Sequence, residues 1–404
     1  MDAPLRFGIL GLGRGSSGMI VALARHPVAR ITAAADVRLE PLQRFGRDFE
    51  VETFTDAEHF CASPDVDVVY VATPHQFHAE HVILAAEHGK HVVVEKPMAL
   101  TLAECDTMIE AADRNGVHLV VGHTAGHNPA VKRMRQIVAS GELGRLGLIN
   151  VAAYTEFLYR ARRPEELDTE RGGGIIFNQV PHQVDAVRLV GGGLVRSVRA
   201  MTGVWDKNRP TEGCHAAFLD FEDGAAAVIV YSGYDHFLSA ELRTSTDPTE
   251  RHELPVSNGE TRRRLRELTT ENDEASLVAA SGYGSGRYAD VGGDLWQQEL
   301  GHMIVSCERG DIRLVADGLV IYDDAGRRAH PIAAEGGVRG RRDVVDEVVA
   351  AARGVAQPAH SGRWAKATLA VCLATLQSSR ERREIMVQHQ VPTLDESLLI
   401  DGRR

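Results

Sequence analysis

A glycine-rich turn directly follows the first apolar run of the chain and limits the folds it can adopt. The run Leu5–Leu10 leads into Gly11-Leu12-Gly13-Arg14-Gly15-Ser16, and a helical stretch through Met19–Arg25 follows. Gly11 permits a tight turn, Gly13 lets the backbone approach a pyrophosphate, and Ser16 stands where a third glycine is usual. The N–H groups and positive dipole end of the helix favour phosphate. The turn therefore predicts a dinucleotide site.

An acidic residue follows the next apolar run and indicates which dinucleotide is bound. Asp36 comes directly after Arg30–Ala35. A carboxylate there can accept hydrogen bonds from the adenosine ribose hydroxyls and would repel the 2′-phosphate of NADP. Arg38 lies two residues further on and could accept that phosphate instead. The sequence predicts NAD, with NADP as the less favoured cofactor.

Apolar runs alternate with stretches of helical periodicity from Leu5 to about His123. The helix expected over Leu102–Asn115 begins with a capping box of Thr101 and Glu104. This alternation predicts an α/β fold with an N-terminal Rossmann domain over residues 1–125, built on a doubly wound parallel sheet. The other expected elements are strands Val66–Ala72, His91–Val94 and His118–Val121 and helix Phe77–His88.

The pattern changes after Pro129, where strands follow one another with a hairpin turn at Glu222-Asp223-Gly224. It predicts a C-terminal α+β domain over residues 126–404 with a largely antiparallel open sheet. Residues 247–292 are polar and predict an insertion or lid. The expected helices are Ala130–Ser140, Ile176–Leu189, Arg342–Arg353 and Arg363–Arg380, and the expected strands are Leu146–Thr155, Val195–Gly203, Ala216–Phe221 and Ala225–Tyr231.

Composition excludes several classes of partner. The net charge of -11 argues against nucleic acid as a ligand. Five scattered cysteines without a Cys-x-x-Cys pair suit a reducing compartment and give no thiolate metal site. No apolar run approaches the roughly 20 residues that span a bilayer, and no signal peptide is apparent, so a cytoplasmic protein is expected. His75, His78 and His81 lack acidic or thiol companions, so no metal site is predicted.

Further motifs resemble the signature of the glucose–fructose oxidoreductase, inositol dehydrogenase and rhizopine-catabolism family (Gfo/Idh/MocA). The resemblance covers essentially the whole chain. It implies an oxidoreductase with its substrate at the junction of two domains, against the nicotinamide. The motifs are Ala72-Thr73-Pro74, His78, Gly89-Lys90-His91-Val92, Glu95-Lys96-Pro97, Gly172-Gly173-Gly174 with His182 and Asp185, and His360-Ser361-Gly362.

The resemblance also assigns roles. Lys96 and His182 correspond to the residues that serve the redox carbon, and Asn178 stands where an aspartate is frequent, which favours substrate binding over proton transfer. His75 replaces a common asparagine, and Gly126-His127-Asn128 replaces an arginine-containing segment. The expected cofactor-binding residues are Gly11, Gly13, Arg14, Ser16, Asp36, Thr73, Pro74, His75, His78, Glu95 and Lys96.

The chemistry of Lys96 and His182 suits alcohol oxidation. A lysine beside a cationic nicotinamide should have a lowered pKa and can hydrogen-bond a developing alkoxide, and a histidine is a natural proton acceptor. Asn178, His182 and Asp185 would share one face of a single helix, where Asp185 could orient the imidazole. The alternative is a structural histidine satisfied by a helix neighbour.

A narrower likeness concerns the substrate. The segment Phe157–Asp168, with Thr211-Glu212-Gly213 and Tyr231-Ser232-Gly233-Tyr234, resembles the branch named for phthalate 4,5-cis-dihydrodiol dehydrogenases. Its arginines Arg160, Arg162 and Arg163 could bind carboxylates through two parallel hydrogen bonds, which suits a cyclic dicarboxylate as the substrate. The alternative is that these arginines lie in a solvated loop and bind no substrate. The expected reaction is therefore oxidation of phthalate 4,5-cis-dihydrodiol to 4,5-dihydroxyphthalate.

Other functions stay open at this point. A sugar or inositol dehydrogenase would share every cofactor-binding and catalytic residue, and only the arginine segment separates the two interpretations. A non-catalytic dinucleotide sensor is a third, although retention of both Lys96 and His182 argues against it. An exposed face of the open sheet predicts a homo-oligomer, a dimer or a tetramer.

Overall fold

The computed structural model describes residues 3–398 except 250–257, 269–270, 285–294 and 334–339. Its N-terminal part is a six-stranded sheet with the order β3-β2-β1-β4-β5-β6, and all neighbouring strands are parallel. The predicted doubly wound parallel sheet is confirmed. Its strands are β1 (Leu5–Leu10), β2 (Ala29–Ala35), β3 (Glu52–Phe54), β4 (Val68–Val71), β5 (His91–Val94) and β6 (Leu119–Val121).

Both faces of this sheet are buried, which explains why its central strands read as continuous apolar runs. Val68 and Tyr70 of β4 pack in one apolar cluster, and Val69 and Val71 pack in another. The capping box at the start of α5 is present, with the Thr101 side chain accepting from the Glu104 N–H. The helices are α1 (Ser17–Ala24) and α2 (Leu39–Phe49) on one face and α3 (Ala57–Ala62), α4 (His78–Glu87) and α5 (Leu102–Arg114) on the other.

The C-terminal part is a nine-stranded sheet with the order β14-β13-β12-β11-β7-β10-β9-β8-β15. All its pairs are antiparallel except β10 with β7. The prediction of a largely antiparallel sheet is confirmed, but strands β11 to β14 were not expected. The strands are β7 (Leu146–Tyr154), β8 (Val195–Gly203), β9 (Cys214–Phe221), β10 (Ala226–Ser232), β11 (His302–Cys307), β12 (Gly310–Val315), β13 (Gly318–Asp323), β14 (Gly326–Pro331) and β15 (Ile385–Met386).

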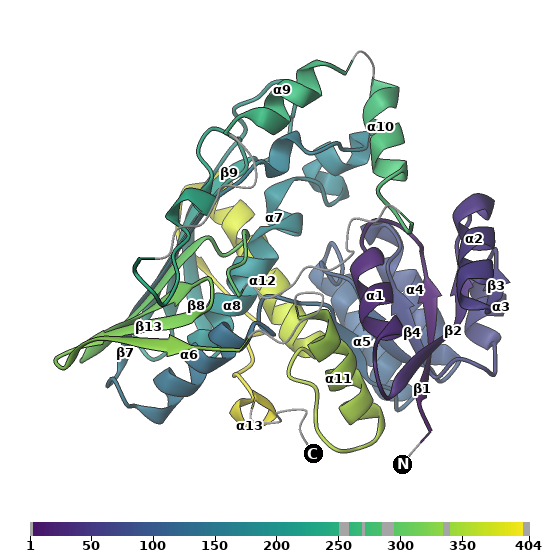
Figure 1. The fold of residues 1–404 in the computed structure, drawn as a ribbon, viewed down its shortest axis with the longest axis horizontal. Coiled ribbons are helices and arrows are strands. Elements are labelled where there is room, and N and C mark those ends of the chain that lie inside the picture. Colours follow the sequence, from purple (N-terminus) through teal and green to yellow (C-terminus); the bar gives the residue numbers. More distant parts are fainter. Residues whose placement is uncertain (1–2, 250–257, 269–270, 285–294, 334–339, 399–404) are drawn as a thin grey trace.

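Helices cover one face of this sheet and connect it to the N-terminal part (Figure 1). The single helix expected over Ile176–Leu189 is two helices interrupted at Gln179, because Pro181 has no N–H with which to continue the hydrogen bonds of the first helix. The helices are α6 (Pro129–Ser140), α7 (Gly174–Asn178), α8 (Val180–Val190), α12 (Gly362–Glu381) and the short α13 (Asp395–Leu398).

A helix from the C-terminal part completes the N-terminal one. In α11 (Arg341–Ala352), Val344, Val345 and Val348 are buried in the same apolar cluster as α1 and α2. The strand β6 also pairs with Ser361 just before α12. A single domain boundary near residue 125 therefore does not describe the fold completely, because α11 follows that boundary in the sequence but packs with the N-terminal part.

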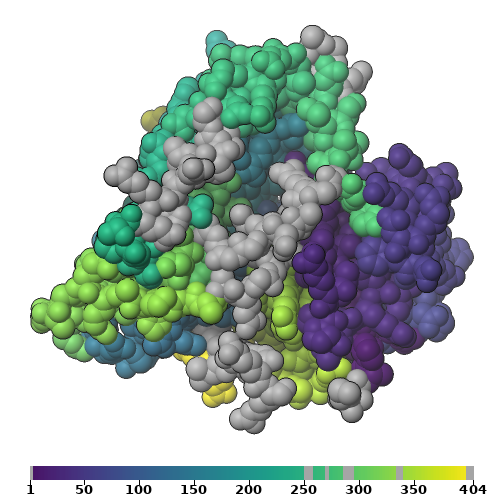
Figure 2. Space-filling model, in the orientation of Figure 1, coloured from purple at the N-terminus to yellow at the C-terminus, as the bar shows by residue number. Residues whose placement is uncertain are grey.

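The predicted insertion over 247–292 lies partly outside the described residues. Its described part contains α9 (Glu260–Arg266) and α10 (Glu271–Ala279), which extend from the C-terminal part toward the N-terminal one (Figures 1 and 2). The Glu274 carboxylate accepts from Arg209 at 2.7 Å, and the Tyr283 hydroxyl donates to Asp48 at 2.7 Å. This segment therefore contacts both parts. No helix in the described ranges is long and apolar enough to cross a membrane.

Candidate active site

A cavity of about 1060 Å³ lies between the two parts of the molecule. One end is formed by the glycine turn after β1 and by Asp36 after β2. The other end is formed by Lys96 after β5, by Asn178 and His182 of the α7–α8 pair, and by the segments around Arg160 and Gln298. The carboxyl ends of parallel strands are where ligands bind in such folds. Most of the predicted site residues therefore share one cavity.

The glycine turn fits the phosphates of a dinucleotide. Gly11 has φ +99°, and a Cβ atom there would lie 2.8 Å from the carbonyl oxygen of Ala72, so only glycine is tolerated. A Cβ at Gly13 would meet no heavy atom within 4 Å, which leaves its backbone open to the cavity. The Ser16 hydroxyl is buried and donates to the carbonyl of Gly13 at 2.9 Å, which closes the turn where a third glycine is usual.

Asp36 lies at the same end of the cavity as the glycine turn, and its carboxylate binds that turn and Arg38. It accepts from the Leu12 N–H at 2.8 Å and from the Arg38 guanidinium at 2.8 and 3.0 Å. Burial alone would raise the pKa of Asp36, but the hydrogen bonds from Arg38 and Leu12 outweigh it and lower that pKa. The carboxylate is therefore charged at neutral pH and can accept hydrogen bonds from ribose hydroxyls.

We expect the native enzyme to prefer NAD over NADP and Asp36→Ala to weaken that preference, because a carboxylate at this position would repel the 2′-phosphate. The value of kcat/KM with each cofactor measures this preference. Arg38→Ala is the matched control and should leave the use of NAD nearly unchanged. A native enzyme that works equally well or better with NADP would contradict the assignment.

The motif residues after β4 form the wall between the two ends. Thr73, Pro74 and His75 line the cavity. Both ring nitrogens of the buried His78 lie 2.9 Å from backbone carbonyls, those of Thr73 and Pro97. His78 thus connects the Thr-Pro and Glu-Lys-Pro motifs and also lines the cavity, and its contact with the cofactor stays a prediction. The Glu95 carboxylate accepts from the Tyr70 hydroxyl at 2.6 Å.

Lys96 is the central charged group of the cavity. Its Nζ donates to the backbone carbonyl of Asn178 at 2.6 Å. Burial, the largest effect, lowers the pKa of Lys96 to about 8, although the charges of Glu95 and Glu299 oppose this shift. A lysine with such a pKa is neutral in part of the molecules near neutral pH and can accept a proton. The lowered pKa expected from the sequence is thus present before any cofactor is considered.

Asn178 and His182 line the cavity, but their contacts differ from expectation. The Asn178 side chain donates to the carbonyls of Gly172 and Gly174 at 3.1 and 2.8 Å, so it holds the turn before α7, while its own backbone carbonyl accepts from Lys96. Burial and then the charges of Lys96 and His123 place the pKa of His182 well below its usual value. His182 is therefore a neutral imidazole, and a weaker proton acceptor than Lys96.

Asp185 does not line the cavity, contrary to the substrate-binding role predicted for it. Its carboxylate accepts from the Gly126 N–H at 2.9 Å and from the Trp364 indole at 2.7 Å. Within the described residues it makes no hydrogen bond to His182. The break at Gln179 is the physical reason why Asn178 and Asp185 do not share one continuous helix face.

The three predicted arginines lie at the cavity, and each already has an acidic partner. Arg160 pairs with Glu156 at 2.6 Å and donates to Gln298 at 3.0 Å. Arg162 has a side chain only 4% exposed, contacts Glu166 at 3.3 Å and stacks on Phe157. Arg163 is 40% exposed and approaches Glu165 and Glu166 at the cavity edge.

One glutamate joins the arginines to the cofactor end. Glu166 Oε1 lies 3.0 Å from Arg14 and 3.3 Å from Arg162. It therefore connects the glycine turn after β1 with the segment 157–168 across the cavity. Sequence reasoning missed several acidic and amide residues that line the cavity, among them Glu156, Glu166, Gln297, Gln298 and Glu299, and also the cavity-lining Arg341.

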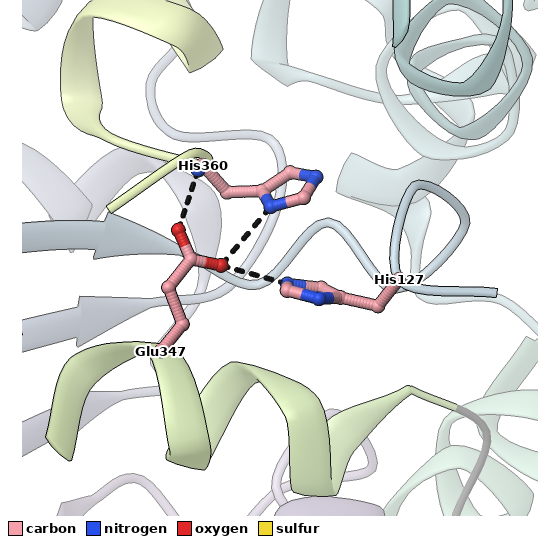
Figure 3. Close-up of side chains that lie close together, drawn as sticks. All are labelled: His127, Glu347 and His360. Atoms are coloured by element: carbon pink, nitrogen blue, oxygen red, sulfur yellow. Dashed lines mark hydrogen bonds and ion pairs between the residues drawn. The ribbon is translucent and has the colours of Figure 1, made fainter. Parts of the chain in front are cut away.

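A buried cluster lies beside the cavity wall and was also missed (Figure 3). The Glu347 carboxylate Oε2 lies 3.0 Å from one nitrogen each of His127 and His360, and Oε1 accepts the His360 N–H at 2.5 Å. Asp185 lies 3.8 Å from the other side of His360. These three side chains are the one group among the described residues with the spacing of metal ligands. Because the carboxylate already bonds within the cluster, we interpret it as a network that joins α11 to α12.

Comparisons with known proteins show the family to which the chain belongs. Residues 5–123 match the oxidoreductase family with an NAD-binding Rossmann fold, and residues 131–244 match the GFO/IDH/MocA C-terminal domain. A relative, 1-carboxy-3-chloro-3,4-dihydroxycyclohexa-1,5-diene dehydrogenase of Comamonas testosteroni, is 37% identical over 384 residues, covering 93% of this chain and 95% of the relative. Myo-inositol 2-dehydrogenase of Thermotoga maritima is 31% identical over 242 residues, 57% of this chain and 71% of the relative.

A solved structure extends the agreement to the whole fold. A protein of Bordetella bronchiseptica RB50, named there as a dehydrogenase, is 44% identical with a TM-score of 0.86, covering 95% of this chain and 100% of that one. The glycine turn, the parallel sheet and the match to the NAD-binding family define an oxidoreductase with a nicotinamide dinucleotide site. The chain belongs to the Gfo/Idh/MocA oxidoreductase family.

Proposed function

We propose that the protein oxidises a secondary alcohol in the cis-dihydrodiol of an aromatic carboxylate, with NAD as the cofactor. The observation that carries this proposal is that Lys96 and His182 line the same cavity as the glycine turn. The name of the Comamonas testosteroni relative describes a carboxylated dihydroxycyclohexadiene as the substrate of that protein, which supports the substrate class.

Different residues of the cavity serve different steps in the oxidation of one alcohol group. Bound NAD supplies the acceptor for the hydride that leaves the carbinol carbon. Lys96, with a pKa of about 8, takes the hydroxyl proton, because its pKa lies closer to the working pH than that of His182. The neutral His182 imidazole hydrogen-bonds the same oxygen. Loss of hydride and proton turns CH–OH into C=O, and the resulting hydroxy-enone tautomerises to a catechol.

The rate should depend on the protonation of Lys96. A proton acceptor must be neutral, and the fraction of neutral lysine rises as the pH passes its pKa of about 8. We expect kcat/KM for the diol to rise with pH and to level off above about 8. Lys96→Arg should abolish this rise, because arginine stays protonated throughout. A native profile that is flat between neutral and alkaline pH would contradict the role of Lys96.

Arg160 is our choice for the group that binds a substrate carboxylate. Its side chain is 24% exposed, and Glu156 and Gln298 fix its Nε and one terminal nitrogen. Within the described ranges the other terminal nitrogen has no hydrogen-bond partner, so its donors can serve a ligand. Arg162 is enclosed and Arg163 lies at the outer edge, so we assign them to the bridge with Glu166. The cavity is thus best suited to one carboxylate, while the 4,5-diol of phthalate carries two.

Turnover of a substrate panel with NAD tests the proposed function. The panel contains singly and doubly carboxylated cis-dihydrodiols, uncharged cis-dihydrodiols, sugars and inositols, and the near-ultraviolet absorbance of reduced cofactor is followed. The highest kcat/KM should fall on a carboxylated diol. A clear preference for inositol or a sugar would establish the alternative, which the Thermotoga maritima relative favours.

A further inference from the structure

Glu299 lines the cavity with a carboxylate that the steps described above do not use. Within the described part of the chain it forms no hydrogen bond and no ion pair, although it is more than half buried. The other half-buried or buried carboxylates of the cavity are bonded: Asp36 to Arg38, Glu95 to Tyr70, Glu156 to Arg160, Glu165 to Arg163, and Glu166 to Arg14. A partly buried carboxylate without a partner is costly, unless a ligand supplies the donor.

The backbone around Glu299 is fixed at the substrate end of the cavity. The N–H groups of Leu300 and Gly301 both donate to the carbonyl of Gln297, at 3.1 and 2.9 Å. Gly301 has φ +55°, and a Cβ there would lie 2.3 Å from the Ala152 carbonyl, so this turn packs tightly against β7. The neighbouring Gln298 donates to Glu156 at 2.5 Å and accepts from Arg160. Glu299 therefore belongs to a preorganised group rather than to a free loop.

The position of Glu299 also relates it to the reacting groups. Its negative charge acts on both Lys96 and Arg160 and favours their protonated forms. A cis-diol presents two adjacent hydroxyl groups, of which Lys96 and His182 serve only the one that is oxidised. The second hydroxyl is a hydrogen-bond donor that needs an acceptor in the cavity, and an ionised carboxylate is the strongest acceptor among protein side chains.

We propose that Glu299 binds the substrate by accepting a hydrogen bond from the hydroxyl group adjacent to the carbinol that is oxidised. Glu299 thereby selects vicinal diols over single alcohols, while Arg160 selects the carboxylate. This inference rests on the proposed function, because it assigns a residue to the second hydroxyl of the same substrate.

Steady-state kinetics of Glu299→Gln test the inference with two substrates, a carboxylated cis-dihydrodiol and the analogue that lacks the second hydroxyl. We expect KM for the diol to rise about 10-fold or more, as for a lost charged hydrogen bond, while KM for the single alcohol stays within about 2-fold. The kcat values are compared above the pH at which the rate levels off, where Lys96 is neutral in both proteins, and should change little there. Glu165→Gln is the matched control, because Glu165 also lines the cavity but already pairs with Arg163.

The outcomes separate this inference from the proposed function. If the native enzyme oxidises the diol and Glu299→Gln leaves its KM unchanged, the role of Glu299 is overturned and the proposed function stands. An equal rise of KM for both substrates would also overturn it, because the hydroxyl would not be what Glu299 recognises. If the native enzyme oxidises no diol, both proposals fall together.

Discussion

Lys96→Ala should lower kcat for diol oxidation by about 10²–10⁴-fold, the usual contribution of a proton-transfer group. The reason is that Lys96 is the cavity residue whose pKa, about 8, suits it to take the hydroxyl proton near neutral pH. Binding of NAD, measured by titration calorimetry, should stay within a few-fold of the native value. His182→Ala should lower kcat less than Lys96→Ala, because its low pKa leaves it a hydrogen-bonding role.

Lys207→Ala provides the control for removal of a lysine, since Lys207 is exposed and does not line this cavity. Its kcat should equal that of the native enzyme. Near-normal turnover by Lys96→Ala would show that another group removes the proton. A larger loss for His182→Ala than for Lys96→Ala would reverse the roles that we assign to the two residues.

Arg160→Ala should raise KM for a carboxylated diol by about 10–100-fold, which corresponds to roughly 1.5–3 kcal/mol for a charged hydrogen bond. The same variant should change KM for an uncharged diol by much less, because only the carboxylate contact is removed. Steady-state kinetics with the two diols measure the difference.

Arg163→Ala is the matched variant, because Arg163 lies in the same segment but is 40% exposed and pairs with two glutamates. We expect it to raise KM for the carboxylated diol only slightly. Equal effects of Arg160→Ala on charged and uncharged diols would show that Arg160 is structural. A larger effect of Arg163→Ala would move the carboxylate site to the outer edge of the cavity.

Much of the fold could be predicted because burial leaves a clear pattern in the sequence. Strands buried on both faces, such as β4 and β5, read as unbroken apolar runs. The edge strands β3 and β14 have mostly exposed side chains, so no apolar pattern marks them. The apolar run of β13 was a usable signal for the β11–β14 meander.

The break between α7 and α8 explains the main error at the site. Proline lacks an N–H donor and is tolerated in the first turn of a helix, so Pro181 was the available sign that a second helix begins near Val180. The contacts of Asp185 with Gly126 and Trp364 join positions far apart in the sequence. No local pattern could have predicted them.

The acidic partners of the arginines were partly predictable. Glu156 with Arg160 and Arg162 with Glu166 are both four residues apart, a spacing that often brings opposite charges together. Glu299 gave no such signal, because its position depends on the pairing of β11 with β7. Its proximity to Lys96 and Arg160 arises only in the folded chain.

Transfer of a labelled hydrogen tests the central claim most directly. A carboxylated cis-dihydrodiol with deuterium on both carbinol carbons is incubated with the enzyme and NAD, and the reduced cofactor and the product are analysed by mass spectrometry. We expect one deuterium in each reduced cofactor and one catechol for each cofactor reduced. Reduced cofactor without deuterium, or no reduction while a sugar or inositol is oxidised, would contradict the account.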